Sequence, residues 1–134
     1  MTPDDARKIL YENFADWVLA LAPEVVEFET THTLIRMPLG EHLARVGGIV
    51  SGQALAALAD TSMVLCAIAH AGEFKLFATT DLHTQFLRPG VGTAILCRAE
   101  VVRAGRALIF ARAQMSEESS GKLVATATAT FYAP

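Results

Sequence analysis

The sequence predicts an α+β fold in which a curved, meandering antiparallel β-sheet wraps around one long apolar helix. The predicted helix lies in the run GGIVSGQALAALADTSMVLCAIAHAG, residues 47–72, which is apolar at most positions. The segments after it alternate apolar and polar residues, which is typical of strands with one covered face. Short turns separate these segments, as hairpins require. With 134 residues, 52% of them hydrophobic, the chain is expected to form a single domain, residues 1–134.

An N-terminal helix is expected before this core. Asp4 or Asp5 is the predicted cap, Pro23 ends the segment, and the helix should run to about Leu21. Its apolar stripe comprises Ile9, Leu10, Phe14, Trp17, Val18 and Leu21. The stretch EVVEFETTHTLIRMPL then predicts two short extended pieces, and GEHLARVGG a loop. The central helix should begin with Ser51 as N-cap and Gly52 in its first turn.

The second half of the chain predicts the rest of the sheet. One face of the stretch 74–86 should carry Phe74, Leu76, Ala78, Thr80, Leu82 and Phe86. Turns are expected at Pro89-Gly90, at Ala104-Gly105 and in the polar break SEESSGK. The strands between and after them should bury Ile95, Cys97, Ala99, Val101, Leu123, Ala125, Ala127, Ala129 and Phe131.

The totals narrow the functional classes. A net charge of −3 argues against a nucleic-acid or anionic-membrane binder. The apolar run 54–71 approaches membrane-spanning length, but its polar residues and the half-polar strands after it favour a buried core helix. The first residues lack an apolar signal core, so a cytoplasmic location is expected. Two separated cysteines and four histidines without shared spacing indicate neither a disulfide scaffold nor a metal site. A helix apolar on all sides must be enclosed, and a second copy of the chain is the expected cover.

Asp60 is the one formally charged residue between Arg45 and Glu73. An ionised carboxylate in apolar surroundings is costly unless something satisfies it, and its helical neighbours offer no partner. It either meets a backbone amide or an arginine of the sheet, or it does chemistry. The start of the helix favours chemistry, because the free amides near Gly52 and the positive dipole end suit a developing oxyanion. A carboxylate acting as general base or nucleophile, together with an oxyanion site, can hydrolyse an activated acyl group.

The spacing of these two residues makes this a prediction about assembly. Gly52 and Asp60 are separated by about 12 Å along a helix that rises ~1.5 Å per residue. They therefore cannot both reach one carbonyl from the same helix. Two helices packed antiparallel about a two-fold axis would set Gly52 of one copy beside Asp60 of the other, giving two shared sites per dimer.

Three pieces of the sequence, GGIVSGQALAALAD, TQFLRPG and VVRAGR, resemble the hotdog-fold acyl-CoA thioesterases of the PaaI-like (phenylacetic-acid-degradation) type. The resemblance covers roughly residues 23–132. It implies a hotdog fold, a sheet wrapped around a central helix, in homodimers and often homotetramers with sites at the dimer interface. It also implies hydrolysis of coenzyme A thioesters with no metal or other cofactor, coenzyme A being part of the substrate.

The resemblance assigns roles to individual positions. Asp60 matches the catalytic acid, and Gly52 matches the glycine whose amide polarises the thioester carbonyl. Thr79 or Thr80 falls where a supporting hydroxyl is found. Candidates for contacting the nucleotide phosphates are Arg88, Arg103 and Arg106, although each is equally well explained as a surface side chain.

Two departures from the family pattern stand out. The helix start reads Ser51-Gly52-Gln53 where the family has His-Gly-Gly, and Arg45 stands where many members have Asn. Arg45 is therefore a fourth candidate for contacting the substrate. Ser51 and Gln53 then supply the polar groups of this turn. Met63 and Phe77 are expected to line the acyl pocket, which leaves both aryl and medium-chain acyl groups open.

Three other functions compete with the thioesterase hypothesis. A serine hydrolase would use Ser51 with His42 or His70, but the G-x-S-x-G elbow is absent. A hotdog dehydratase of hydroxyacyl thioesters would need the histidine that Ser51 replaces. A non-catalytic acyl-CoA binder gains nothing from a buried carboxylate. Desolvation should raise the pKa of the Asp60 carboxyl group, and solvent access and nearby hydroxyls should limit that rise. Hydrolysis that disappears in Asp60→Asn while binding survives would separate these hypotheses.

Overall fold

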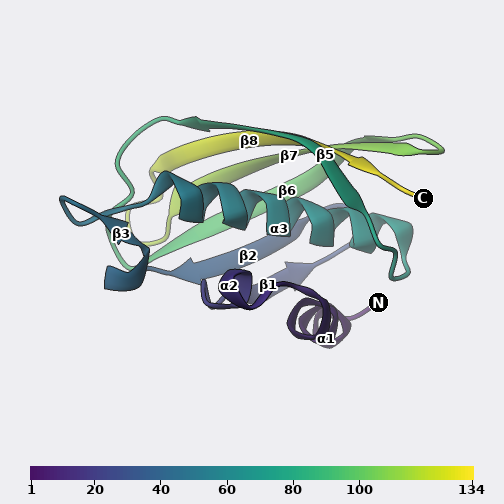
Figure 1. Cartoon of the computed structure of the whole chain (residues 1–134), viewed down its shortest axis with the longest axis horizontal. Helices are drawn as coiled ribbons and strands as arrows, with labels where there is room; N and C mark the ends of the chain where they lie inside the picture. Colours follow the sequence, from purple (N-terminus) through teal and green to yellow (C-terminus); the bar gives the residue numbers. More distant parts are fainter.

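The computed structural model describes all 134 residues, and its main element is a six-stranded antiparallel sheet curved around the helix α3, Gly52–Ala71 (Figure 1). The strand order is β1-β2-β6-β7-β8-β5. The strands are β1 (Glu24–Phe28), β2 (Thr33–Pro38), β5 (Ala78–Phe86), β6 (Ala94–Ala104), β7 (Leu108–Glu117) and β8 (Leu123–Tyr132). The predicted α+β architecture, with a long central helix and an N-terminal helix, is confirmed.

The central helix α3 begins where the sequence predicts, and it ends with the apolar run. Ser51 is its N-cap, and its hydroxyl oxygen accepts a hydrogen bond of 3.2 Å from the Ala54 amide. Gly72 closes the helix in the left-handed conformation, with φ of 74°. This helix has the length and hydropathy of a membrane span, but 67% of the relevant window is buried inside the fold, as in the core helix of a globular domain.

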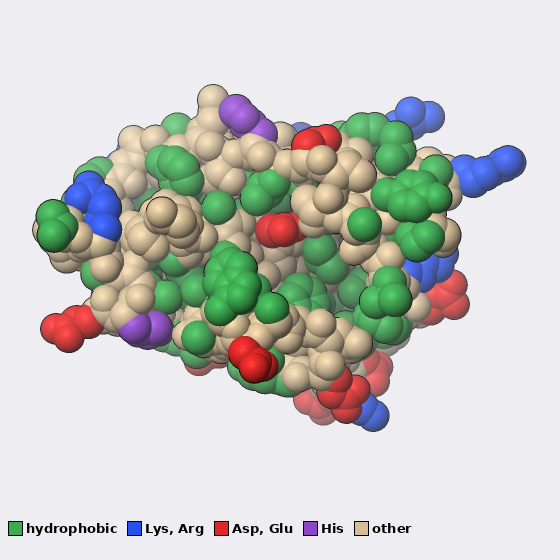
Figure 2. Space-filling model, viewed as in Figure 1, with side chains coloured by type: hydrophobic (Ala, Val, Ile, Leu, Met, Phe, Trp, Pro, Cys, Tyr) green, Lys and Arg blue, Asp and Glu red, His purple; other side chains and the backbone are tan.

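One stripe of α3 is left uncovered by the chain's own sheet. Its members, none of which is fully buried, are Gln53, Ala56, Ala57, Asp60 and Val64. In Figure 1 this helix is flanked by β5 on one side and by the N-terminal helices on the other. Figure 2 shows hydrophobic side chains gathered on the same face, around an acidic group in its middle.

The N-terminal region differs from the single helix that was predicted. Thr2, not Asp4 or Asp5, caps α1 (Pro3–Asn13), and it forms a reciprocal capping box with Asp5. The chain is extended at Phe14 and Ala15 before a second short helix, α2 (Asp16–Leu19). This break lets α1 pack on β1 while Phe14, Val18 and Leu19 pack against the core. Trp17 is consequently 64% exposed and does not belong to a buried stripe.

The predicted loop before α3 contains more structure than expected. A 3-10 turn, η1 (Glu41–Leu43), leads into a small antiparallel ribbon of β3 (Ala44–Arg45) and β4 (Ile49–Val50). The ribbon is tied to the β5–β6 connection by a 3.0 Å hydrogen bond from the Val50 amide to the Gly90 carbonyl. The start of α3 is therefore held from two sides.

Strand β5 departs from the predicted alternation at its beginning. Residues 73–77 lie outside the strand, and the pairing with β8 skips Thr80, because Thr79 pairs with Phe131 and Asp81 with Thr130. This bulge reverses the expected faces at the strand's start, so Thr79 rather than Thr80 faces α3. Beyond the bulge Leu82 pairs with the buried Ala129, as the period-two pattern predicts.

The remaining strands build most of the core that the sequence predicts, although Val101 is only half-buried and packs at its margin. The inward residues of β6, β7 and β8 join those of α3 and α1 in a single cluster of 32 buried residues. Near the start of β8 another irregularity places Val124 in the core and leaves Leu123 half-buried. These three central strands and α3 form the rigid frame on which the residues of interest are held.

Candidate active site

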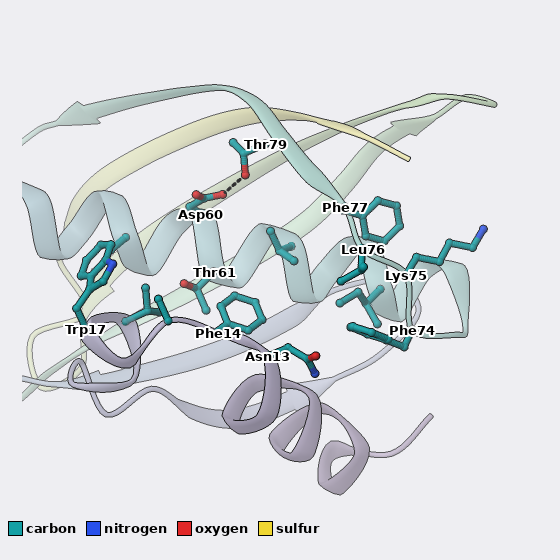
Figure 3. Close-up of a pocket in the computed structure, with 15 residues that line it drawn as sticks. Asn13, Phe14, Trp17, Asp60, Thr61, Phe74, Lys75, Leu76, Phe77 and Thr79 are labelled. Carbon is teal, nitrogen blue, oxygen red and sulfur yellow. Dashed lines mark hydrogen bonds between the residues drawn. The ribbon is translucent and has the colours of Figure 1, made fainter. Parts of the chain in front are cut away.

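Asp60 lies midway along the open stripe of α3, half-buried, and faces the beginning of β5. The Thr79 hydroxyl donates a 2.9 Å hydrogen bond to its Oδ1 atom, the contact drawn in Figure 3. Oδ2 accepts no hydrogen bond, and no basic side chain pairs with the carboxylate. The partner of Asp60 is therefore a single neutral hydroxyl, and neither a backbone amide nor an arginine of the sheet.

This environment favours the protonated form of Asp60. Desolvation by the surrounding apolar residues raises the pKa of the carboxyl group above its ordinary value of 3.8, and the hydrogen bond from Thr79 lowers it in part. The direction and both causes agree with the sequence-based prediction. A carboxylate that is desolvated but still open on one oxygen is suited to accept a proton from a bound water.

A cavity of about 310 Å³ opens beside Asp60. Its polar lining is sparse, and four of the chain's ten aromatic residues take part in its wall. These are Phe14 from the break after α1, Trp17 from α2, and Phe74 and Phe77 from the segment before β5 (Figure 3). Of the two predicted pocket residues, Phe77 lines this cavity, whereas Met63 is fully buried in the core and does not.

The Gly52 end of α3 opens into a different cavity, of about 390 Å³. The amides of Gly52 and Gln53 donate no hydrogen bond within the chain, because they belong to the first turn of the helix. The Phe86 ring covers Gly52 so closely that an added Cβ would lie 3.2 Å from it. Arg45 and Arg88 line the same cavity, so the structure brings two of the four candidate arginines to the free amides.

The other candidate residues are placed less centrally. Ser51 uses its hydroxyl oxygen as the helix cap, and Gln53 is exposed on the open stripe. Thr80 donates its hydroxyl to the Thr130 carbonyl at 3.1 Å and does not meet Asp60. Arg103 and Arg106 lie at the β6–β7 hairpin, at the opposite end of the sheet from β3 (Figure 1).

The geometry gives no support to a serine hydrolase or a histidine-dependent dehydratase. Neither the Asp60 cavity nor the Gly52 cavity has a histidine in its lining. Ser51 and Asp60 belong to different turns of the helix, and His70 is exposed at its far end. No group of three His, Cys, Asp or Glu side chains is arranged to hold a metal ion.

Sequence reasoning missed several residues that shape the two cavities. Trp17 and Val18 reach the Asp60 cavity only because the N-terminal helix breaks, and nothing in the pattern around residue 14 signals that break. Phe86 was assigned to a sheet face, but its position over Gly52 depends on the register of β5 with β8. Register is a tertiary property that local alternation does not encode.

Comparison with known proteins agrees with the geometry. Residues 42–132 match the family described as the acyl-CoA thioesterase N-terminal domain. The chain belongs to this family. The matched range includes α3 with Gly52 and Asp60, as well as β5 to β8. Membership makes the protein a hydrolase of thioesters with the hotdog fold.

Individual relatives support the same classification. The chain is 29% identical over 113 residues to the esterase-named protein Ta0293 of Thermoplasma acidophilum, covering 80% of this chain and 83% of that protein. A thioesterase-named structure from Silicibacter sp. TM1040 is 27% identical with a TM-score of 0.88, covering 100% of this chain and 92% of the other. Zebrafish thioesterase superfamily member 2 shows the same fold, with a TM-score of 0.88 at 22% identity, covering 100% of this chain and 99% of that chain.

Proposed function

We propose that this protein is an acyl-CoA thioesterase of the PaaI-like type, which hydrolyses an arylacyl-CoA to the free acid and coenzyme A. The observation that carries the proposal is the pairing of two incomplete half-sites on one helix. Asp60 offers an unpaired carboxylate oxygen in one cavity, and Gly52 offers a free amide in another. Together they supply the base and the oxyanion donor that acyl transfer requires.

A homodimer would join these half-sites. Leu82 and Phe86 face the α3 side of the sheet, yet they are 37% and 54% exposed, and β5 has an unpaired edge. Together with the open stripe of α3, they form an apolar strip that a second copy would cover. An antiparallel arrangement of two α3 helices sets Gly52 of one protomer beside Asp60 of its partner. Such dimers can pair further into the tetramers expected from the family resemblance.

The proposed chemistry needs only these groups and water. Asp60 takes a proton from a water molecule as the water oxygen bonds to the thioester carbonyl carbon. The Gly52 amide of the other protomer donates to the developing oxyanion. Collapse of the tetrahedral intermediate breaks the carbon–sulfur bond, and the departing thiolate takes the proton from Asp60. Direct attack of Asp60 on the carbonyl, followed by hydrolysis of the mixed anhydride, uses the same contacts.

The lining of the Asp60 cavity favours an aromatic acyl group. Phe14, Trp17, Phe74 and Phe77 offer ring faces and edges for stacking, which is worth about 0.5–1.5 kcal/mol per pair beyond apolar burial. Linear chains gain burial but not this geometry. Arylacyl esters should therefore be better substrates than medium-chain esters of similar size.

The coenzyme A portion would lie toward the other cavity. Arg45 and Arg88 line it and form no ion pair within the chain. The Arg88 guanidinium is free to contact phosphate oxygens, whereas Arg45 already donates one hydrogen bond, of 2.7 Å, to the Val46 carbonyl and keeps its remaining donors for a ligand. Arg103 and Arg106 are at the far end of the same protomer. An antiparallel dimer brings the partner's hairpin toward the Gly52 end, so these two arginines would act only across the interface.

The first test is release of free thiol from a panel of aryl- and alkyl-acyl-CoA esters, with wild type beside Asp60→Asn. The proposal expects turnover that falls about 10²–10⁴-fold in the variant. Calorimetry with coenzyme A should show unchanged binding to the variant, which separates lost chemistry from lost affinity. Tight binding without turnover of any ester by the wild type would instead identify an acyl-CoA binding protein.

Shared sites can be tested by complementation. Gly52→Pro removes the amide hydrogen, while proline at the first helical position is compatible with the helix. A mixture of Asp60→Asn and Gly52→Pro chains forms heterodimers with one intact site each, so about a quarter of wild-type activity should return in a statistical mixture. Both proline and alanine place a Cβ about 3.2 Å from the Phe86 ring, so Gly52→Ala, which keeps the amide, is the control for that contact. No recovery after chain exchange would place both groups of each site in one protomer.

A further inference from the structure

Glu117, the last residue of β7, is an unusually well satisfied buried carboxylate. The residue is 3% exposed. It accepts hydrogen bonds from the amides of Thr93, Ser119 and Ser120 at 3.1, 3.0 and 2.9 Å, and from the Ser119 hydroxyl at 2.6 Å. The Thr93 hydroxyl, shared with Glu118, lies 3.4 Å away. All of these donors are neutral, so the charge of Glu117 is solvated by the fold itself.

These hydrogen bonds join two separate segments. Ser119 and Ser120 belong to the β7–β8 turn, whereas Thr93 ends the connection between β5 and β6. The preceding Gly92 has φ of 135°, and a Cβ there would lie 2.3 Å from the carboxyl carbon of Glu117. The carboxylate therefore fills the space against a glycine backbone and fixes where the connection enters β6.

The same connection carries Arg88. At its beginning, the amides of Leu87 and Arg88 both donate to the Val124 carbonyl, at 2.8 and 3.3 Å. In its middle, Gly90 packs so tightly on Val50 that a Cβ would lie 2.5 Å from that side chain. The connection is thus anchored at its start, its middle and its end. Its middle anchor touches the residue that immediately precedes the N-cap of α3.

The guanidinium of Arg88, in contrast, has no hydrogen-bonding partner in the chain. Arg88 lines the Gly52 cavity and also a neighbouring cavity of about 610 Å³, which Glu117 lines as well. The two opposite charges form no ion pair, although they border the same space. The donors around Glu117 occupy its oxygens and leave the arginine available.

We propose that Glu117 is a positioning residue for the coenzyme A site. It holds the Gly92–Thr93 end of the β5–β6 connection so that Arg88 projects beside the free amides of α3, and it does so without neutralising the arginine. This inference rests on the proposed function, because it assigns Arg88 to the phosphate groups of the substrate. It adds a residue that does not itself touch the ligand.

The test is a double-mutant cycle on coenzyme A binding, measured by calorimetry on the full chain. Arg88→Ala should weaken binding by about tenfold, as loss of a charge-assisted contact does. Glu117→Gln should weaken binding by about three- to thirtyfold in wild type, and by little more in the Arg88→Ala background. Glu100→Gln is the matched control: it removes a carboxylate that pairs with Arg112 at the sheet surface, and it should leave binding unchanged.

Hydrolysis gives a second readout that general destabilisation would not produce. In Glu117→Gln the KM for an acyl-CoA ester should rise while kcat stays near the wild-type value. The KM for the matching acyl-pantetheine ester, which lacks the nucleotide, should not change. Gly92→Ala, which displaces the same carboxylate by a different route, should repeat this pattern.

The outcomes separate this inference from the proposed function. Unchanged coenzyme A binding in Glu117→Gln, or an equal loss with and without Arg88, would overturn the positioning role. A wild type that binds coenzyme A but hydrolyses no ester would refute the thioesterase proposal, and the binding cycle would still decide the role of Glu117.

Discussion

Asp60 and Glu117 are two carboxylates withdrawn from solvent in the same small domain, and their surroundings differ in one respect that decides their chemistry. Asp60 receives one hydrogen bond and is otherwise surrounded by apolar residues, so its pKa is raised. Glu117 receives three amide hydrogen bonds and at least one from a hydroxyl. Those hydrogen bonds hold the pKa of Glu117 well below the ordinary value of 4.5, and the bond from the Ser119 hydroxyl has the largest effect.

Burial alone therefore does not distinguish a reactive carboxylate from a structural one. What matters is how many donors the fold supplies to the charged form. A saturated carboxylate such as Glu117 has no oxygen left for a water or a substrate, and it serves the structure. A carboxylate with too few hydrogen-bond donors, such as Asp60, keeps an oxygen free and can accept a proton.

The largest effect expected from this difference is a crossover between two variants, in which one loses activity and the other loses stability. Asp60→Asn should lower kcat about 10²–10⁴-fold without lowering the melting temperature, because it removes a desolvated charge with one hydrogen bond. Glu117→Gln should lower the melting temperature and leave kcat near the wild-type value, because its amide group puts a donor where the turn already supplies donors. Thermal unfolding and initial-rate assays on both variants measure the crossover. A fully active Asp60→Asn would remove the basis of the comparison.

A smaller effect is an opposite dependence of stability on pH. Folding buries ionised Asp60 at a cost that is complete above its raised pKa. The cost shrinks as pH falls below that pKa and is gone below the ordinary value of 3.8, where both states are protonated. Glu117 stabilises the folded state above its unfolded pKa, near 4.5, and this contribution is lost as pH falls below that value.

Urea unfolding at neutral and acid pH measures both contributions. Asp60→Asn should be more stable than wild type at neutral pH, and the difference should vanish in acid. Glu117→Gln should be less stable at neutral pH and should converge with wild type in acid. Differences of equal sign for the two variants at neutral pH would show that the two environments do not differ as described.

Much of the fold follows from local sequence signals. Ser51 marked the start of α3, because N-capping depends on adjacent residues, and the change from an apolar run to alternation after residue 72 marked where the helical pattern stops. Alternation likewise identified most of the inward residues of β6 and β8. The break after α1 was not predictable, since it arises from packing on two different surfaces and not from a glycine or proline.

The residues of interest likewise fall into those that the sequence could predict and those that it could not. Asp60 and Gly52 could be selected from the sequence, because a lone carboxylate in an apolar helix and a glycine at a helix start are visible locally. Glu117 could not, because SEESSGK has the composition of an exposed turn. Its burial depends on Gly92, which is 25 residues away in the chain and meets it only in the folded sheet.

The choice between Thr79 and Thr80 also needed the structure, and it provides the smallest of the expected effects. Thr79 donates to Asp60 and so lowers the pKa of the carboxyl group in part. Thr79→Val removes that donor, so the pKa should rise further and the acid limb of the kcat/KM profile should move to higher pH. At high pH, where Asp60 is ionised in both proteins, the activities should approach each other.

Thr80→Val is the matched control, because the bulge directs that hydroxyl to the Thr130 carbonyl on the neighbouring strand. Its acid limb should coincide with that of wild type. A shift in the Thr80 variant and none in the Thr79 variant would mean that the register of β5 is one residue away from the one described here. No shift in either would mean that the acid limb reports a group other than Asp60, so that carboxylate would not be the base.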